Sequence, residues 1–153
     1  MRGLRALVGS IGMLLALGPG ATSAQESPNF AGRWVLVSPA DSAGQEQTVT
    51  QDAAKLTTAH ASDGDGHRSV YRLDGAESRN VLGSHGSDIV TLSTASWNGN
   101  RLTITNNTTY PDGRKRHTTQ VWSLEGKDRL VIEFTESGPS ATPRTTTLVY
   151  ARR

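Results

Sequence analysis

The residues best able to do chemistry in this sequence are its four histidines, His60, His67, His85 and His117. Imidazole binds metal ions and haem iron, and it transfers protons near neutral pH. No pair has the His-x-His or His-x-x-x-His spacing of a strong metal motif. Two alternatives remain: a set of metal ligands brought together from different strands, and a haem bound by one histidine. Each histidine is close to a polar turn, so we predict solvated surface residues, no metal site and no cofactor.

The segment Asp63-Gly64-Asp65-Gly66-His67 has the acidic start of a calcium-binding loop. Such a loop needs Gly at its sixth position and Glu at its twelfth, and here those positions hold Arg68 and Asp74. We therefore predict a hairpin turn at this segment. No Gly-x-Ser-x-Gly motif occurs, and the carboxylates are too scattered to name a catalytic pair. No residue set in the chain predicts an enzyme.

A short basic run, Arg114-Lys115-Arg116-His117, follows Tyr110 closely in the chain. Its side chains could contact a phosphate group. Short runs of this kind are more often the solvated edge of a strand, where charge discourages pairing with another chain. We therefore predict a solvated strand edge here.

The first 24 residues have the pattern of a cleaved secretory signal peptide. Arg2 and Arg5 form a positive start, and Leu4 to Leu17 is an apolar run too short to span a membrane. Gly18-Pro19-Gly20 breaks this run, and Thr22-Ser23-Ala24 offers a small-residue cleavage site. An uncleaved anchor is the alternative. We predict a secreted or periplasmic protein that has no membrane span after cleavage.

The remaining chain has the size and composition of one domain. Removing 24 from 153 leaves 129 residues, 25–153. The whole chain has 16 Lys and Arg and 14 Asp and Glu, and two of the arginines lie in the signal peptide. The mature chain is thus close to neutral, so we expect no nucleic acid and no anionic membrane as partner. A secreted chain without Cys depends on its own packing, which suits a closed barrel.

Turn residues recur about every 8–12 positions, and no apolar period near 3.6 persists after the signal peptide. This pattern predicts a single antiparallel up-and-down β-barrel of about eight strands, with almost no helix. Loops are expected at 83–86 and 138–143. The expected strands are Gly32–Val37, Gln45–Gln51, Lys55–Ser62, His67–Leu73, Asp88–Trp97, Arg101–Thr109, Arg114–Leu124, Arg129–Glu136 and Thr145–Arg152.

The stretch Asn29-Phe30-Ala31-Gly32-Arg33-Trp34 opens the first of these strands. Gly32 lets the chain turn sharply and allows another backbone to come close. Alternation along the strand places Trp34 and Leu36 on one face. Trp34 is therefore predicted to be a large apolar plug whose N–H needs a partner.

This opening resembles that of the calycin group, the lipocalins and fatty-acid-binding proteins, which begin with a turn and Gly-x-Trp. It is also similar to small secreted bacterial proteins that open Asn-Phe-x-Gly-x-Trp. The closing stretch Thr147–Arg152 looks like the last strand of the fatty-acid binders. The resemblance implies that Leu148, Tyr150 and Arg152 face inward and that Arg152 packs on Trp34. Gly32, Trp34 and Arg152 would then close one end of the barrel.

The chain also departs from the fatty-acid binders at two places. Those proteins carry a helix pair between their first two strands, whereas only Ser38 to Gly44 separates the strands here. Their carboxylate is held by Arg-x-Tyr on the last strand. Tyr150 matches that motif, but Leu148 stands at the Arg position. We therefore expect a neutral or weakly polar ligand.

The expected inward side chains are Trp34, Leu36, Leu102, Ile104, Trp122, Leu124, Ile132, Phe134, Leu148 and Tyr150. They either enclose a mostly apolar pocket or fill the barrel themselves. We predict a lipocalin-like protein that binds a small apolar molecule through Trp122, Phe134 and the Tyr150 hydroxyl. The alternative is a filled β-barrel that acts through its surface as a protein-interaction or inhibitory module. The sequence predicts no oligomeric state.

Overall fold

The computed structural model describes residues 27–61, 68–83, 87–138 and 142–153. The predicted signal peptide and the predicted turn at 63–66 lie outside the described residues. So do parts of the expected loops at 83–86 and 138–143.

Ten antiparallel strands and one short 3-10 helix, η1 (Ala40–Ser42), make up the described chain. All ten strands form one sheet in the order β4-β3-β2-β1-β10-β9-β8-β7-β6-β5. The strands are β1 (Gly32–Ser38), β2 (Glu46–Gln51), β3 (Lys55–His60), β4 (Arg68–Arg72), β5 (Ser78–Leu82), β6 (Ile89–Asn98), β7 (Arg101–Thr109), β8 (Lys115–Glu125), β9 (Arg129–Ser137) and β10 (Arg144–Arg152).

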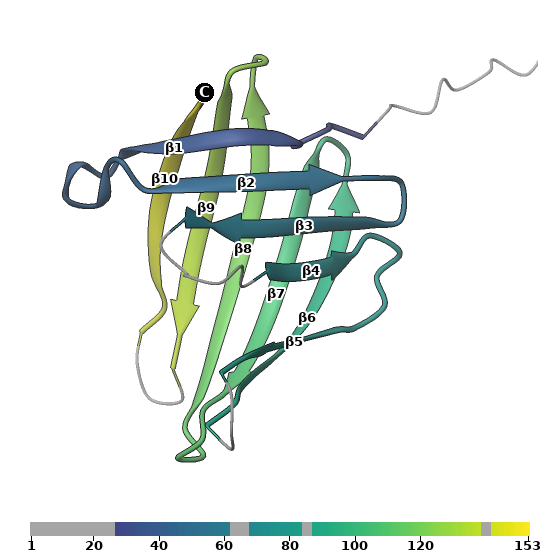
Figure 1. Ribbon diagram of the computed structural model, residues 1–153, viewed down its shortest axis with the longest axis vertical. Coiled ribbons are helices and arrows are strands. Elements are labelled where there is room, and N and C mark those ends of the chain that lie inside the picture. Colours follow the sequence, from purple (N-terminus) through teal and green to yellow (C-terminus); the bar gives the residue numbers. More distant parts are fainter. Residues whose placement is uncertain (1–26, 62–67, 84–86, 139–141) are drawn as a thin grey trace, which may run out of the picture.

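The sheet curls until its two edge strands, β4 and β5, come together. In Figure 1, β1 to β4 lie across the longer strands β6 to β10, and β5 runs beside the lower part of β6. Side chains bridge the remaining seam. The Val70 amide donates to Asn80 Oδ1 at 2.8 Å, and Asn80 Nδ2 donates back to the Val70 carbonyl at 3.0 Å. The Arg72 amide donates to Ser78 Oγ at 2.9 Å, so the barrel is nearly closed.

The predicted all-β barrel is confirmed, but it has ten strands rather than about eight. Nine expected strands are present within two residues of their predicted bounds. The tenth is β5, which the sequence pattern missed. Its residues Ser-Arg-Asn-Val-Leu lack an apolar alternation, and the strand is defined by its pairing with β6.

Strand alternation separates a buried inner face from an outer one. Trp34 and Leu36 are buried on β1, and Val35 between them is only half-buried, as the spacing predicted. Half-buried Leu73, Trp97, Leu124 and Leu148 pack against the core. The buried core contains Phe30, Trp34, Leu36, Val49, Leu56, Tyr71, Ala95, Leu102, Ile104, Trp122, Leu130, Ile132 and Tyr150.

One end of the barrel is plugged by aromatic side chains. Phe30 stacks on Trp97 with ring centroids 5.8 Å apart, and it meets Trp122 edge to face at 5.6 Å. Trp34 Nε1 donates to the Phe30 carbonyl at 2.9 Å, which satisfies the indole N–H inside the core. The residues just before β1 therefore close this end of the barrel, because the Phe30 ring among them is fully buried against Trp97 and Trp122.

Arg152 fastens this plug to the last strand. Its guanidinium carbon lies 4.3 Å from the Trp34 ring centroid, and its Nη1 donates to the Ala31 carbonyl at 2.9 Å. Gly32 has φ of 152°, and a Cβ there would collide with Arg152 Nη1. These contacts agree with the placement of Gly32, Trp34 and Arg152 that the calycin resemblance implied.

Candidate ligand-binding site

The inner wall of the barrel is polar along β6, β7 and β8. Ser93 Oγ donates to Asn106 Oδ1 at 2.7 Å, and Asn106 Nδ2 donates to Thr118 Oγ1 at 3.3 Å. All three side chains are buried. Farther from the plug, the hydroxyls of Thr91 and Thr108 lie 3.0 Å apart. This half of the interior therefore offers hydroxyl and amide groups and is more polar than the mostly apolar lining that the sequence suggested.

The opposite part of the inner wall, on β9 and β10, is more apolar. Strand alternation places Ile132 and Phe134 of β9 on the inner face, with Leu148 of β10 paired to Ile132. Ile132 is buried, whereas Phe134 and Leu148 are half-buried. An apolar strip thus leads from the core toward the end of the barrel that lies away from the plug.

The three predicted ligand-binding residues lie at different depths in the barrel. Trp122 touches Phe30 in the plugged core, and its Nε1 donates to Gln120 Oε1 at 2.9 Å. Tyr150 pairs with Leu36 and Leu130 and is also buried, and burial raises the pKa of its hydroxyl. Phe134 lies nearer the open end. Contact of these residues with a ligand stays a prediction.

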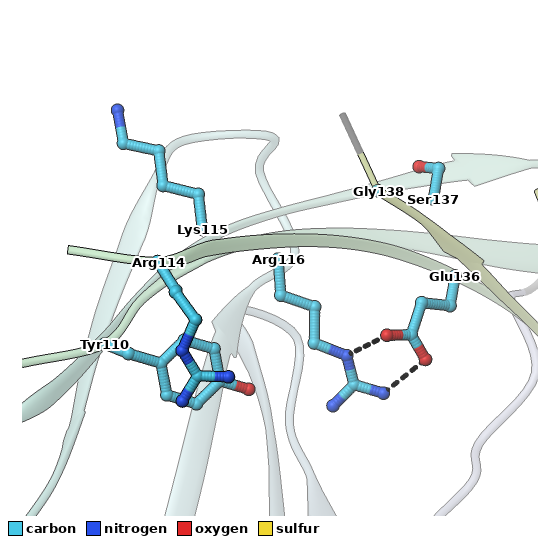
Figure 2. A pocket seen from close by; sticks show the side chains of 7 residues that line it. All are labelled: Tyr110, Arg114, Lys115, Arg116, Glu136, Ser137 and Gly138. Carbon is cyan, nitrogen blue, oxygen red and sulfur yellow. Dashed lines mark hydrogen bonds and ion pairs between the residues drawn. The ribbon is translucent and has the colours of Figure 1, made fainter. Parts of the chain in front are cut away.

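A pocket of about 580 Å³ lies at the end of the barrel opposite the plug, where β8 begins and β9 ends. Figure 2 shows that Tyr110, Arg114, Arg116 and Glu136 project to one side of the strands, while Lys115 and Ser137 project to the other. Arg116 is two residues from buried Thr118 on the same strand, so this side is the inner face. The full lining is Tyr110, Arg114, Lys115, Arg116, Glu136, Ser137 and Gly138.

Arg116 and Glu136 form the central ion pair of this pocket. Arg116 Nε lies 2.8 Å from Glu136 Oε1, and Arg116 Nη2 lies 2.7 Å from Glu136 Oε2, as the dashed lines in Figure 2 mark. These hydrogen bonds raise the pKa of Arg116, with a weaker contribution from the Tyr110 hydroxyl, and they lower the pKa of Glu136. The guanidinium also lies 5.8 Å from the ring centroid of Phe134.

Arg114 lies beside this pair on the rim of the pocket. Its guanidinium carbon is 5.0 Å from the ring centroid of Tyr110, and its Nε pairs with Asp112. The run 114–117 was predicted to be a solvated strand edge, but it leads into β8, which is paired with both β7 and β9. Lys115 and His117 face outward, but Arg114 and Arg116 face the interior. Because successive side chains of a strand point to opposite faces, the sequence alone could have indicated that the four residues divide between the two faces.

Two further hollows border the same barrel. One of about 510 Å³ shares Lys115, Arg116, Ser137 and Gly138 with the first pocket and adds outward side chains such as Leu92. Another, of about 130 Å³, lies at the seam and is lined by residues from both sides of it, among them Ser69 and Asn80. The first two pockets thus adjoin at the open end of the barrel, and both include the inner-face residue Arg116.

Within the described residues, no group of three or more His, Asp or Glu side chains is placed to hold a metal ion. His117 lies on the outer face with Nδ1 2.8 Å from Asn107 Oδ1, and His60 lines the seam hollow. His67 and His85 lie outside the described residues. In the same part of the chain, no helix is long and apolar enough to cross a membrane.

No protein-family model and no curated protein matches the chain. Among solved structures it is similar to a protein described as "REP1-NXSQ fatty acid transporter". That likeness has a TM-score of 0.55 and 14% sequence identity, and it covers 80% of this chain and 95% of the other. At this identity the likeness shows the fold alone. The chain thus has the barrel fold of a protein named as a transporter, which agrees with the calycin-like architecture expected from its two ends.

Proposed function

We propose that this protein binds a small, largely apolar molecule in its barrel and carries it without chemical change. The observation that carries this proposal is the pocket of about 580 Å³ at the unplugged end, where the lining residue Arg116 lies over the half-buried ring of Phe134. Pockets of a few hundred Å³ that combine apolar area with a few polar groups are typical small-molecule sites. The fold that the chain shares with a named fatty acid transporter supports the same function.

The proposed ligand lies along the apolar strip of β9 and β10, with its polar part toward the hydroxyls of β7 and β8. Phe134 and Leu148 supply apolar area, at about 25 cal/mol per Å² before the costs of association. Trp122 and Tyr150 would contact only the innermost end of the ligand. The buried Gln47 Nε2 has no hydrogen-bond partner among the described residues. Since such a donor is costly to leave unpaired, it supports a bound water or ligand atom in the interior.

We propose further that the protein acts outside the cytoplasm. The support is the pattern of the first 24 residues, with two arginines, an apolar run and a small-residue cleavage site. A carrier in the periplasm or medium would meet apolar molecules that are poorly soluble in water.

The test is a titration of the delipidated protein with the neutral fluorescent probe phenylnaphthylamine, together with native mass spectrometry of protein purified from its own host. We expect saturable probe binding that Phe134→Ala weakens and that a co-purified molecule competes away. Val121→Ala is the matched control, because Val121 is an apolar residue on the outer face of the neighbouring strand. No saturable binding and no co-purified mass would contradict the proposal and favour the filled barrel that acts through its surface.

A further inference from the structure

Arginine side chains gather on the inner face at the open end of the barrel. Arg114 and Arg116 line the pocket there. Arg144, at the start of β10, is paired directly with Glu136 across the β9–β10 ladder. Residues opposite each other in such a ladder have Cβ atoms about 4.5–5.5 Å apart. Glu136 thus lies between two arginines, and the charges of both lower its pKa.

The charges at this end do not balance. Three arginines, Arg114, Arg116 and Arg144, face two carboxylates, Asp112 and Glu136. Asp112 pairs with Arg114, and Glu136 pairs with Arg116. Among the described residues, no carboxylate lies within ion-pair distance of Arg144. Positive charge is therefore in excess, and Lys115 in the pocket lining adds to it, so the pocket complements a negatively charged group.

The geometry of Arg116 specifies the kind of anion. Its Nε and Nη2 both bind Glu136, in the side-on arrangement by which guanidinium groups recognise carboxylates. The pair is also accessible, since the Arg116 and Glu136 side chains keep 40% and 48% of their exposure. An incoming carboxylate could therefore replace Glu136 on the same two donors. Its hydrocarbon part would then extend past Phe134, over whose ring Arg116 already lies.

We infer that the open end binds the carboxylate of an amphipathic acid, and that Glu136 is the resident counter-ion which this carboxylate displaces from Arg116. Arg144 neutralises the second negative charge while both carboxylates are present. This inference rests on the proposed function and deepens it, because it names an anionic ligand where the last strand alone suggested a neutral one. It uses residues at the mouth of the barrel, whereas Leu148 and Tyr150 lie deeper along β10.

The experiment compares two probes, dansyl-undecanoic acid and its uncharged methyl ester, by fluorescence titration of the delipidated protein. We expect the wild type to bind the acid at least about tenfold more tightly than the ester, as for one charged hydrogen-bonding group. Arg116→Gln and Arg144→Gln should each remove most of that preference for the acid over the ester. Glu136→Gln should raise acid affinity, because it removes the competing carboxylate.

The matched control is Arg101→Gln. Arg101 pairs with Glu133 at 2.7 Å on the outer face of the same sheet, so its loss removes an equivalent ion pair away from the pocket. Arg116→Lys is a second variant that keeps the charge without the side-on geometry, and it should retain only part of the preference. Thermal unfolding of each variant near that of the wild type shows that the barrel is intact.

The outcomes separate this inference from the proposed function. Equal affinity of the wild type for acid and ester overturns the carboxylate site, while binding of both probes leaves the carrier function standing. A preference for the acid that survives Arg116→Gln and Arg144→Gln also overturns it. If neither probe binds, the proposed function fails, and the carboxylate site fails with it.

Discussion

At the scale of single residues, Arg152 connects parts of the chain that are far apart in sequence. It lies over Trp34, donates to the Ala31 carbonyl, and donates from Nε to the Lys127 carbonyl at 2.9 Å. Gly32 leaves the space that the guanidinium occupies. The plug is thus held by one cation–π contact and two hydrogen bonds to backbone carbonyls.

Replacement of Trp34 by Ala should destabilise the barrel by about 3–5 kcal/mol, the usual cost of truncating a large buried aromatic residue. The indole is fully buried, and its loss also removes the hydrogen bond to the Phe30 carbonyl. Chemical denaturation followed by circular dichroism measures the change. Arg152→Ala should lower the free energy of unfolding by less than Trp34→Ala does, since the Arg152 side chain is partly exposed where it contacts the ring. A midpoint for Trp34→Ala close to that of the wild type would show that the plug is peripheral.

Glu136 should titrate below the usual range of a glutamate, because hydrogen bonds from Arg116 lower its pKa. A lowered pKa in the folded state means that the pair stabilises the protein above the pKa of the unfolded chain. That contribution disappears as the pH falls through the folded-state pKa. Carboxyl-carbon NMR should show the Glu136 pKa rising toward its ordinary value in Arg116→Gln. An unchanged pKa in that variant would mean that the pair does not persist in solution.

At the scale of elements, strands β6 to β10 could be predicted from the sequence. Their turns contain typical turn residues, and their outward positions carry residues that favour strands. Asn98-Gly99 joins β6 to β7, with Gly99 at φ of 60°. A row of outward threonines crosses all five strands through direct cross-strand pairs, as is favourable in sheets. The row consists of Thr94, Thr105, Thr119, Thr135 and Thr145.

No sequence pattern indicated the seam between β4 and β5, because side chains close it rather than a ladder of backbone hydrogen bonds. The Asn80 amide takes the place of a peptide group, accepting from the Val70 N–H and donating to the Val70 carbonyl. No periodic pattern in the sequence indicates a single side chain in this role. The tenth strand was therefore missed, although its neighbours were found.

Asn80→Ala should open this seam locally. Hydrogen exchange at the Val70 amide should become faster, because its acceptor is lost, while amides in the β7–β8 ladder keep their protection. Exchange measured by NMR tests this. Asn107→Ala is the control, since it removes an exposed asparagine whose side chain binds His117 on the outer face. Equal exchange at Val70 in the wild type and Asn80→Ala would contradict the role given to Asn80.

At the scale of the whole molecule, we expect export with cleavage near Ala24. The positive start and the short apolar run ended by Gly18-Pro19-Gly20 are the basis of this prediction. N-terminal sequencing of protein recovered from the periplasm or medium should begin near Gln25. Met1 retained in the exported protein would show that the segment is not cleaved.

The sequence predicted the barrel and its plugged end better than its open end. Gly32, Trp34 and Arg152 were named from the expected resemblance of the two ends of the chain to the calycins, and in the structure Arg152 lies over Trp34. The pocket residues Arg116 and Glu136 belong to strands of ordinary polar composition. Their pairing depends on the register of β8 with β9, which places Thr118 opposite Glu136. A shift of one residue in this register would put the two side chains on opposite faces of the sheet, so the pocket could not be deduced before the register was known.

The central claim is that a small molecule binds the inner wall at the unplugged end. Its most direct test is an NMR titration of the isotope-labelled, delipidated protein with phenylnaphthylamine, followed at every assigned amide. We predict shifts at inner-face positions of β8, β9 and β10 near the pocket, such as Arg116, Phe134 and Thr146. Trp34 at the plug and Thr105 on the outer face should stay unchanged. Shifts confined to the outer face, or no shifts at a saturating probe concentration, would contradict the claim.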